Sequence, residues 1–152
     1  LAMEMMLWTA KRMGDAIKIG PQHIQDGCFV LTDAKTGKRN WLPIAPQLKA
    51  AINSMETQHL VFIVTSYGKS YSDKSFSQRF SKWCNEAGLP QCSAHGLRKA
   101  MSRRMAEARA TNSEMKSITQ HSGDAELAIY VRDADQKLLA GKTMNILSDI
   151  YK

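Results

Sequence analysis

The spacing of apolar and polar residues along the chain predicts a mainly helical protein. Apolar residues recur every three or four positions in most of the sequence, which is the period of an amphipathic helix. In the clearest example, residues 95–110, one apolar stripe is formed by Leu97, Met101, Met105 and Ala108. Helices are predicted at residues 1–10, 12–19, 48–55 (with Pro46 where a helix usually begins), 75–87, 95–110, 113–120, 124–130 and 135–147.

Short apolar runs of another kind predict strands. Residues 27–31 and 41–44 flank the polar turn Lys35-Thr36-Gly37-Lys38, an arrangement typical of a β-hairpin. Residues 59–65, HLVFIVT, are apolar and rich in β-branched side chains, which favours a short buried strand. No repeat, low-complexity tract or interdomain linker interrupts the chain. We therefore predict one α+β domain over residues 1–152, mainly α with a small antiparallel β-sheet.

Composition and charge narrow the choice of partner. The 152 residues are enough for one domain with a core, and 43% hydrophobic and 23% charged residues are ordinary for a globular protein. The net charge of +7 favours an anionic partner such as nucleic acid, with solubility as the simpler alternative.

The absence of certain motifs from the sequence indicates the compartment and the cofactors to expect. The three cysteines, Cys28, Cys84 and Cys92, have no C-x-x-C spacing, so neither a disulfide framework nor a zinc site is expected, and a reducing cytosol is the natural compartment. No apolar run reaches membrane-spanning length, and no cleavable signal opens the chain. Nothing indicates a nucleotide, a metal or another cofactor.

Two imidazoles, a guanidinium and a phenol lie in one C-terminal segment: His95, Arg98, His121 and Tyr130. His95 and Arg98 are three positions apart on a predicted helix and therefore share a face. A tyrosine phenol has a pKa of about 10 and needs help to attack a phosphodiester. Arginine can bond two phosphate oxygens at once, and histidine or lysine can move protons. The combination favours phosphodiester cleavage by a tyrosine.

These residues lie in segments that resemble the motifs of the tyrosine recombinases, also called the phage integrase family. The segments are His95-Gly96-Leu97-Arg98, Gln120-His121-Ser122-Gly123 and Ile129-Tyr130. Upstream, residues 8–15 resemble the family segment that carries a first catalytic arginine, here Arg12. The hairpin turn resembles the one that carries the family's active-site lysine. We assign that role to Lys35, with Lys38 as a competing position because hairpin register cannot be fixed from sequence.

The resemblance covers nearly the whole chain and implies a mechanism. It implies the catalytic domain of a site-specific recombinase or integrase of a bacterial prophage or mobile element, acting on double-stranded DNA in the cytoplasm without metal or ATP. The tyrosine would form a 3′-phosphotyrosyl intermediate, the arginines would bind the phosphate, the histidines would hydrogen-bond it or manage protons, and the lysine would protonate the leaving oxygen. The implied catalytic residues are Arg12, Lys35, His95, Arg98, His121 and Tyr130.

The resemblance also implies assembly on DNA. Family members act as tetramers, and the amphipathic residues 135–151 would dock on a neighbouring protomer of a homotetramer; the alternative is packing on their own core. Family members carry a separate N-terminal DNA-clamping domain, which we expect to be absent from this chain. The predicted helix at Leu1 has no N-cap residue before it, so we expect that an upstream segment was removed.

Three positions depart from the family pattern. Ala10 replaces a glycine, Asp15 replaces a glutamate, and Gln120 replaces the glycine before the second histidine. If position 120 requires a positive φ angle, glutamine is strained there.

Each assignment has an alternative. Arg12 can be an ordinary surface residue, Lys35 an ordinary turn lysine, and Tyr130 a half-buried aromatic residue with its hydroxyl at the surface. The basic residues of helix 95–110, among them Lys99 and Arg103, either form a solvated face or contact DNA phosphates. The alternative functions are relaxation of DNA by a type IB topoisomerase and DNA binding by a catalytically decayed relative.

Overall fold

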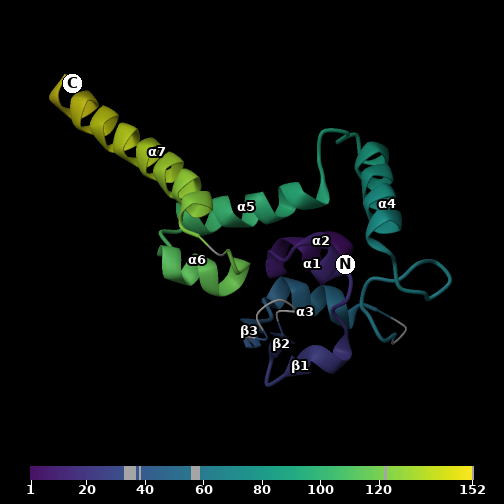
Figure 1. Ribbon diagram of the computed structural model, residues 1–152. Helices are drawn as coiled ribbons and strands as arrows, with labels where there is room; N and C mark the ends of the chain where they lie inside the picture. Colours follow the sequence, from purple (N-terminus) through teal and green to yellow (C-terminus); the bar gives the residue numbers. More distant parts are fainter. Residues whose placement is uncertain (33–36, 38, 56–58, 122, 152) are drawn as a thin grey trace. The chain divides into compact units, whose positions relative to one another are not determined.

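The computed structural model describes residues 1–32, 37, 39–55, 59–121 and 123–151, which form two compact units, Leu1–Met101 and Ser102–Lys152. Helices predominate in both (Figure 1). Within the described residues, the strands form one three-stranded antiparallel sheet. The predicted α+β class is therefore confirmed.

The first unit is built on a group of helices that bury apolar side chains. α1 packs against both α2 and α3 (Figure 1), and Met5 and Met6 of α1 are fully buried. α3 begins at Pro46 as predicted, because the first residue of a helix needs no amide partner. The elements of this group are α1 (Ala2–Thr9), α2 (Met13–Ala16), the short 3-10 helix η1 (Pro21–His23), α3 (Pro46–Asn53) and α4 (Asp73–Glu86).

The bounds of all four α-helices differ from the predicted ones, and α2 differs the most in length. α2 is shorter than the predicted 12–19, because the Ile19 carbonyl leaves the helix and accepts a hydrogen bond from the Phe62 amide at 2.9 Å. α4 begins earlier than predicted, because Ser72 caps it by accepting a hydrogen bond from the Ser75 amide at 3.2 Å. Its buried residues include Phe76, as the periodicity predicts.

The predicted hairpin is confirmed. β2 (Cys28–Thr32) pairs antiparallel with β3 (Arg39–Pro43), and Phe29 of β2 lies opposite Leu42 of β3, with both side chains buried. An additional strand, β1 (Ile24–Gln25), pairs with β2 across a tight turn in which both central residues, Asp26 and Gly27, have positive φ angles. An Asp-Gly pair of this kind is a strong hairpin signal. Lys35 and Lys38 fall outside the described residues.

The predicted strand at 59–65 is wrong. Within the described residues, this run makes only an isolated bridge between Val64 and Ser70. Phe62 and Ile63 are buried, and the Phe62 ring lies 6.1 Å from that of Phe29 between centroids. The run is therefore apolar because it covers the core, and without a neighbouring strand its β propensity does not produce a sheet.

α5 (Ala94–Glu107) contributes residues to both units and ends three residues earlier than predicted. Of the predicted stripe, Met101 and Met105 are buried, whereas Ala108 lies beyond the helix and is exposed. The helix ends where Arg109 adopts a left-handed conformation (φ 66°) and the Ala110 amide donates to the Met105 carbonyl at 2.9 Å. These are features of a Schellman motif, with arginine in place of the usual glycine.

The second unit also contains α6 (Asn112–Thr119) and α7 (Ala125–Ile150). The prediction of two helices at 124–130 and 135–147 is wrong, because α7 is continuous. Its sequence between these ranges contains no glycine or proline that would end a helix. Asp135, which lies in the middle of α7, pairs with Arg109.

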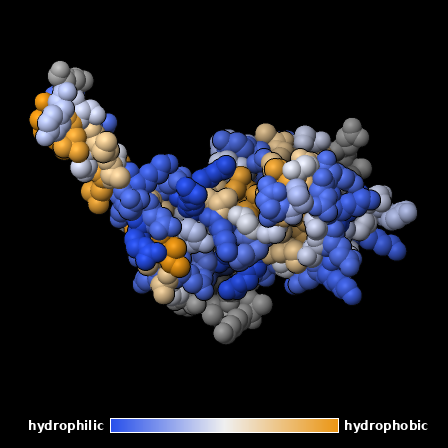
Figure 2. Space-filling model, turned by 90° about the horizontal axis from the view of Figure 1, so that it is seen from above, coloured by the Kyte–Doolittle hydropathy of each residue, from blue (hydrophilic) through white to orange (hydrophobic). Residues whose placement is uncertain are grey.

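Most of α7 is exposed. Leu127 in its first turn is fully buried, whereas every residue from 141 to 150 is exposed. Figure 2 shows orange apolar side chains among blue ones along this C-terminal part. Among the helices of the described residues, none combines the length and apolar character needed to span a bilayer. The exposed large apolar residues of this part are Leu138, Leu139, Met144, Ile146, Leu147 and Ile150.

Candidate active site

The two candidate arginines belong to adjacent parts of the first unit. Arg98 of α5 is only 5% exposed, and its Nη1 donates a hydrogen bond of 2.6 Å to the carbonyl of Ala10. Ala10 is two residues before Arg12, which is exposed and forms the N-cap of α2. The Arg98 guanidinium is therefore held against the backbone segment that presents Arg12.

His95 lies in the first turn of α5, on the same helix as Arg98. The Ser93 hydroxyl oxygen accepts a hydrogen bond from the Gly96 amide at 3.1 Å, which satisfies one of the free amides at the start of this helix. His95 is exposed, whereas Arg98 one turn later is buried. The helix therefore offers one accessible imidazole and one fixed guanidinium.

The two candidate DNA-contacting residues differ in their surroundings. Lys99 is exposed on α5. Arg103 is also exposed, but its Nε pairs with Oε1 of Glu107 at 3.0 Å, one turn further along the helix. An exposed pair of this kind contributes little to stability, so Arg103 can exchange Glu107 for another anion at low cost.

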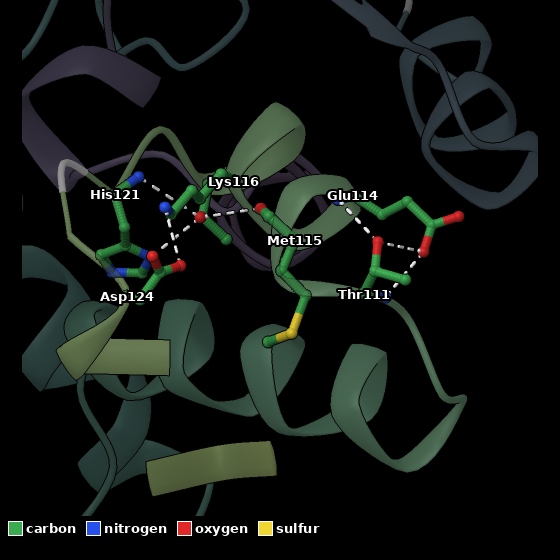
Figure 3. A network of polar contacts seen from close by, with 7 residues as sticks. Thr111, Glu114, Met115, Lys116, His121 and Asp124 are labelled. Atoms are coloured by element: carbon green, nitrogen blue, oxygen red, sulfur yellow. Dashed lines mark hydrogen bonds and ion pairs between the residues drawn. The ribbon is translucent and has the colours of Figure 1, made fainter. Parts of the chain in front are cut away.

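In the second unit, His121 follows α6 and belongs to the polar contacts drawn in Figure 3. Its Nδ1 lies 2.8 Å from the Thr119 hydroxyl oxygen, and that hydroxyl donates to the Met115 carbonyl at 2.8 Å. Its Nε2 lies 3.1 Å from Oε2 of Glu126 in α7. The His121 side chain is 9% exposed and that of Glu126 is 69% exposed. The imidazole is therefore held on one side by a buried hydroxyl and faces an accessible carboxylate on the other.

Two further contacts fix the helices around this histidine. Lys116 of α6 pairs with Asp124, which precedes α7, at 2.7 Å (Figure 3). At the start of α6, hydrogen bonds from the backbone amide and then from the hydroxyl of Thr111 lower the pKa of Glu114 below its ordinary value. Glu114 and Thr111 thus form a capping box.

Both positions at which the chain lacks a family glycine have positive φ angles. Ala10 has φ 48° and Gln120 has φ 57°, and each is the left-handed C-cap of a helix. The expectation that glutamine at position 120 is strained is therefore confirmed. The cost of this conformation for a residue with a Cβ atom is about 1–2 kcal/mol.

The same local structure surrounds these two caps. Thr9 and Thr119 are both buried, and each donates its hydroxyl to the carbonyl four residues earlier. Each hydroxyl oxygen also lies 3.4 Å from the amide two residues later, that of Lys11 or His121. A residue of the predicted motifs follows each cap closely: Arg12 comes two residues after Ala10, and His121 comes directly after Gln120.

Tyr130 lies in the second turn of α7, three residues after the buried Leu127. It is half-buried. Leu127 anchors this part of α7 in the second unit, so the Tyr130 backbone belongs to an ordered helix. Tyr130 and His121 belong to the second unit, whereas Arg12, His95 and Arg98 belong to the first.

Sequence reasoning missed Thr119 and Glu126. Neither belongs to a motif, and the contact of Glu126 with His121 depends on the turn between α6 and α7. Thr119 had a local signal, because a threonine in the last turn of a helix can bond back to the preceding turn. Lys11, which is only 3% exposed, was also missed; a buried lysine next to Arg12 has no signature in a sequence.

The described residues offer phosphate-binding and proton-carrying groups in two sets. The first unit has Arg98, Arg12 and His95, and the second has His121 and Tyr130.

Comparisons with known proteins agree with this reading of the fold. The model of the phage integrase family matches residues 1–137. The crystal structure of XerA recombinase has a TM-score of 0.75 at 14% identity, covering 91% of this chain and 56% of that one. A lambda integrase fragment, in a dimer bound to a COC′ core site, has a TM-score of 0.70 at 22% identity, covering 86% and 50%.

A lambda integrase tetramer bound to a Holliday junction also has a TM-score of 0.70, at 22% identity, covering 88% of this chain and 42% of that one. A search of curated protein sequences gave no significant match. The chain thus spans about half of the length of the recombinases that it matches in structure. The chain belongs to the phage integrase family, the tyrosine recombinases, and has the fold of their catalytic domain.

Proposed function

We propose that this chain is the catalytic domain of a site-specific recombinase that cuts and rejoins double-stranded DNA through a 3′-phosphotyrosyl intermediate. The Tyr130 oxygen forms a bond to the scissile phosphorus, and the bond from phosphorus to the 5′ oxygen breaks. The phenol gives up its proton, and the leaving 5′ oxygen gains one. Because the phosphotyrosyl bond retains the energy of the broken bond, a 5′ hydroxyl can reverse the reaction without ATP or a metal.

The other residues act on the charge and protons of this step. Arg12 and Arg98 bind the nonbridging oxygens and stabilise the charge that builds up in the transition state. His95 and His121 hydrogen-bond the phosphate or manage protons, and Lys35 protonates the leaving oxygen, with Lys38 as the alternative. The observation that carries the proposal is the hydrogen bond from Arg98 to the Ala10 carbonyl, which ties one arginine to the segment of the other across 88 positions of sequence.

Further contacts extend the proposal to the complex with DNA. Lys99 and Arg103 bind phosphates of the duplex. Arg103 leaves its ion pair with Glu107 to do so. The exposed apolar side chains of α7 beyond residue 137 dock on a neighbouring protomer of a DNA-bound homotetramer. This part of α7 lies beyond the family match, which ends at residue 137. The lambda integrase structure in which four copies bind a Holliday junction offers a precedent for such an assembly.

The test is capture of the covalent intermediate. A nicked suicide substrate loses the short strand that carries the 5′ hydroxyl, so that rejoining is blocked and the protein stays attached to DNA. The chain should form a complex with its target DNA that resists denaturation, and Tyr130→Phe should form none. Tyr67→Phe removes the hydroxyl of a tyrosine that is 88% exposed, and should behave like the wild type. Binding of the target without any covalent complex would identify a DNA-binding relative instead.

A further inference from the structure

The contacts of His121 determine where its ring carries hydrogen. The Thr119 hydroxyl lies 2.8 Å from Nδ1 of His121 and also 2.8 Å from the Met115 carbonyl. A hydroxyl has one hydrogen and two lone pairs. It therefore either donates to Met115 and accepts from a protonated Nδ1, or turns to donate to an unprotonated Nδ1. The hydrogen bond between Thr119 and His121 is kept in both arrangements.

The contact of Nε2, on the opposite side of the His121 ring, shows whether this nitrogen carries hydrogen. Nε2 of His121 lies 3.1 Å from Oε2 of Glu126, and a carboxylate can only accept. Nε2 therefore carries hydrogen in either arrangement, whether the ring is an imidazolium or neutral. The third form, a neutral ring with hydrogen on Nδ1 alone, would point the Nε2 lone pair at a carboxylate. The other charged groups of this network, Lys116 and Asp124, pair with each other at 2.7 Å.

Thr119 and Glu126, which contact the two ring nitrogens of His121, differ in how firmly they are held. Thr119 is 1% exposed and fixed to the helix by its bond to Met115. Glu126 is 69% exposed, so its carboxylate can turn into solvent at little cost. A phosphate oxygen is an acceptor of the same kind as a carboxylate oxygen. It can take the place of Glu126 at Nε2 without any change at Thr119.

We propose that Thr119 and Glu126 are positioning residues that preset His121 as an Nε2–H donor to the scissile phosphate. Thr119 braces Nδ1, and Glu126 occupies the position of the phosphate until DNA displaces it. This inference rests on the proposed function, in which His121 contacts the phosphate. It adds that the protonated nitrogen is fixed before DNA arrives, and that Glu126 competes with the substrate for it.

The first experiment needs no activity. Nitrogen NMR of the full chain with labelled histidines distinguishes the two neutral ring forms and the imidazolium, and His121→Gln identifies the His121 signals among those of the four histidines. The spectrum should show hydrogen on Nε2 in the wild type and in Thr119→Ser. Thr119→Val, of nearly equal size, should shift the Nδ1 signal of His121. A neutral ring with hydrogen only on Nδ1, or a Thr119→Val spectrum identical to that of the wild type, would overturn the proposal.

The second experiment measures covalent complex formation on the suicide substrate. Thr119→Val should slow the reaction at saturating DNA roughly tenfold, as expected for the loss of one hydrogen bond, with unchanged half-saturation. Thr119→Ser should restore the rate. Ser117→Ala, which removes another α6 hydroxyl bonded to a helix carbonyl, should leave the rate unchanged. An equal loss in Thr119→Ser and Thr119→Val would overturn the role of the hydroxyl.

Glu126 has its own matched control. Glu126→Ala and Asp133→Ala each remove one exposed carboxylate from α7 and raise the net charge equally. Glu126→Ala should lower the DNA concentration at half-saturation about two- to fivefold below that of Asp133→Ala, the scale of one exposed ion pair, without slowing the saturated reaction. Equal DNA concentrations at half-saturation for Glu126→Ala and Asp133→Ala would overturn the proposed competition between Glu126 and DNA. If no variant, including the wild type, forms a covalent complex, the proposed function fails while the NMR result still decides the state of His121.

Discussion

Arg98 donates a hydrogen bond from Nη1 to the carbonyl of Ala10 at 2.6 Å, and this contact joins α5 to the turn between α1 and α2. The carbonyl is available because Ala10 takes the left-handed conformation that ends α1. Arg12 follows two residues later at the start of α2. One side chain thus stabilises the backbone that presents the other candidate arginine, and the two should differ in what they contribute.

Arg98→Ala and Arg12→Ala should separate stability from catalysis. Both should slow covalent complex formation roughly 10²- to 10³-fold, as the loss of one charge-stabilising donor does. Arg98→Ala should also lower the free energy of unfolding by about 1–3 kcal/mol, because the Ala10 carbonyl loses its partner, whereas Arg12→Ala should change it by less than about 0.5 kcal/mol. Urea denaturation and suicide-substrate kinetics measure both effects. Arg104→Ala, an exposed α5 arginine, is the control; equal stability losses in the Arg12 and Arg98 variants would contradict the arrangement.

Gln120→Gly should stabilise the protein. Glycine adopts φ 57° without the contact between Cβ and carbonyl that glutamine suffers, but it loses more conformational entropy on folding. The free energy of unfolding should therefore rise by about 0.5–1 kcal/mol. The same change at Ser117, an exposed interior position of α6, should lower it by about 0.5–1 kcal/mol. Thermal unfolding should show a higher unfolding temperature than the wild type for Gln120→Gly and a lower one for Ser117→Gly. A loss of stability in Gln120→Gly would mean that glutamine makes a compensating contact.

The capping box of α6 should make stability depend on acid pH. The pKa of Glu114 is lower in the folded protein than in the unfolded chain, so the unfolded chain takes up the proton first as the pH falls. The stabilisation is complete above the ordinary glutamate pKa of about 4.3, and is lost as the pH falls through the lowered value. Urea denaturation at pH 7 and pH 3 should show a smaller pH effect in Glu114→Gln than in the wild type. An equal pH effect in both proteins would rule out this contribution.

Lys99 and Arg103 should contribute to the salt dependence of DNA binding. For each phosphate that a variant no longer neutralises, the slope of log affinity against log salt should fall by about 0.9. The double variant Lys99→Ala with Arg103→Ala should show this in a binding titration over a range of salt concentrations. Lys82→Ala, which removes an exposed lysine that pairs with Glu86 on α4, is the control. A slope equal to that of the wild type would assign the two residues to a solvated helix face.

Removal of residues 137–152 should impair assembly and spare the fold. The residues from 141 to 150 are all exposed, while the buried Leu127 and the pair of Arg109 with Asp135 remain. The truncated chain should unfold at nearly the same urea concentration as the intact one, but should fail to form tetramers on DNA in sedimentation experiments. Loss of folding would show that these residues pack on their own core, and tetramers of normal stability would exclude them from the interface.

The features that the sequence predicted well depend on local signals. The period of apolar residues, the hairpin turn and the proline at the start of α3 each act within a few residues, and the family motifs indicated the candidate site residues. The strain at Gln120 was expected from the resemblance, because the family motif has glycine at this position. These signals led to the correct fold class.

The features that were missed depend on distant contacts. Residues 59–65 have strand propensity, but no neighbouring strand lies beside them within the described residues. The hydrogen bond of Arg98 to Ala10 and the contact of Glu126 with His121 need the folded chain. The prediction divided α7 between residues 130 and 135, although no glycine or proline lies there and the helix is continuous.

Mass spectrometry of the covalent complex tests the central claim most directly. The chain is trapped on a nicked suicide substrate and then digested. The peptide that carries the residual nucleotide is sequenced. The account predicts one modified residue, Tyr130, joined to a 3′ phosphate, with a free 5′ hydroxyl on the other side of the cut. Attachment at another residue, attachment to a 5′ phosphate, or cleavage that leaves no protein on the DNA would contradict it.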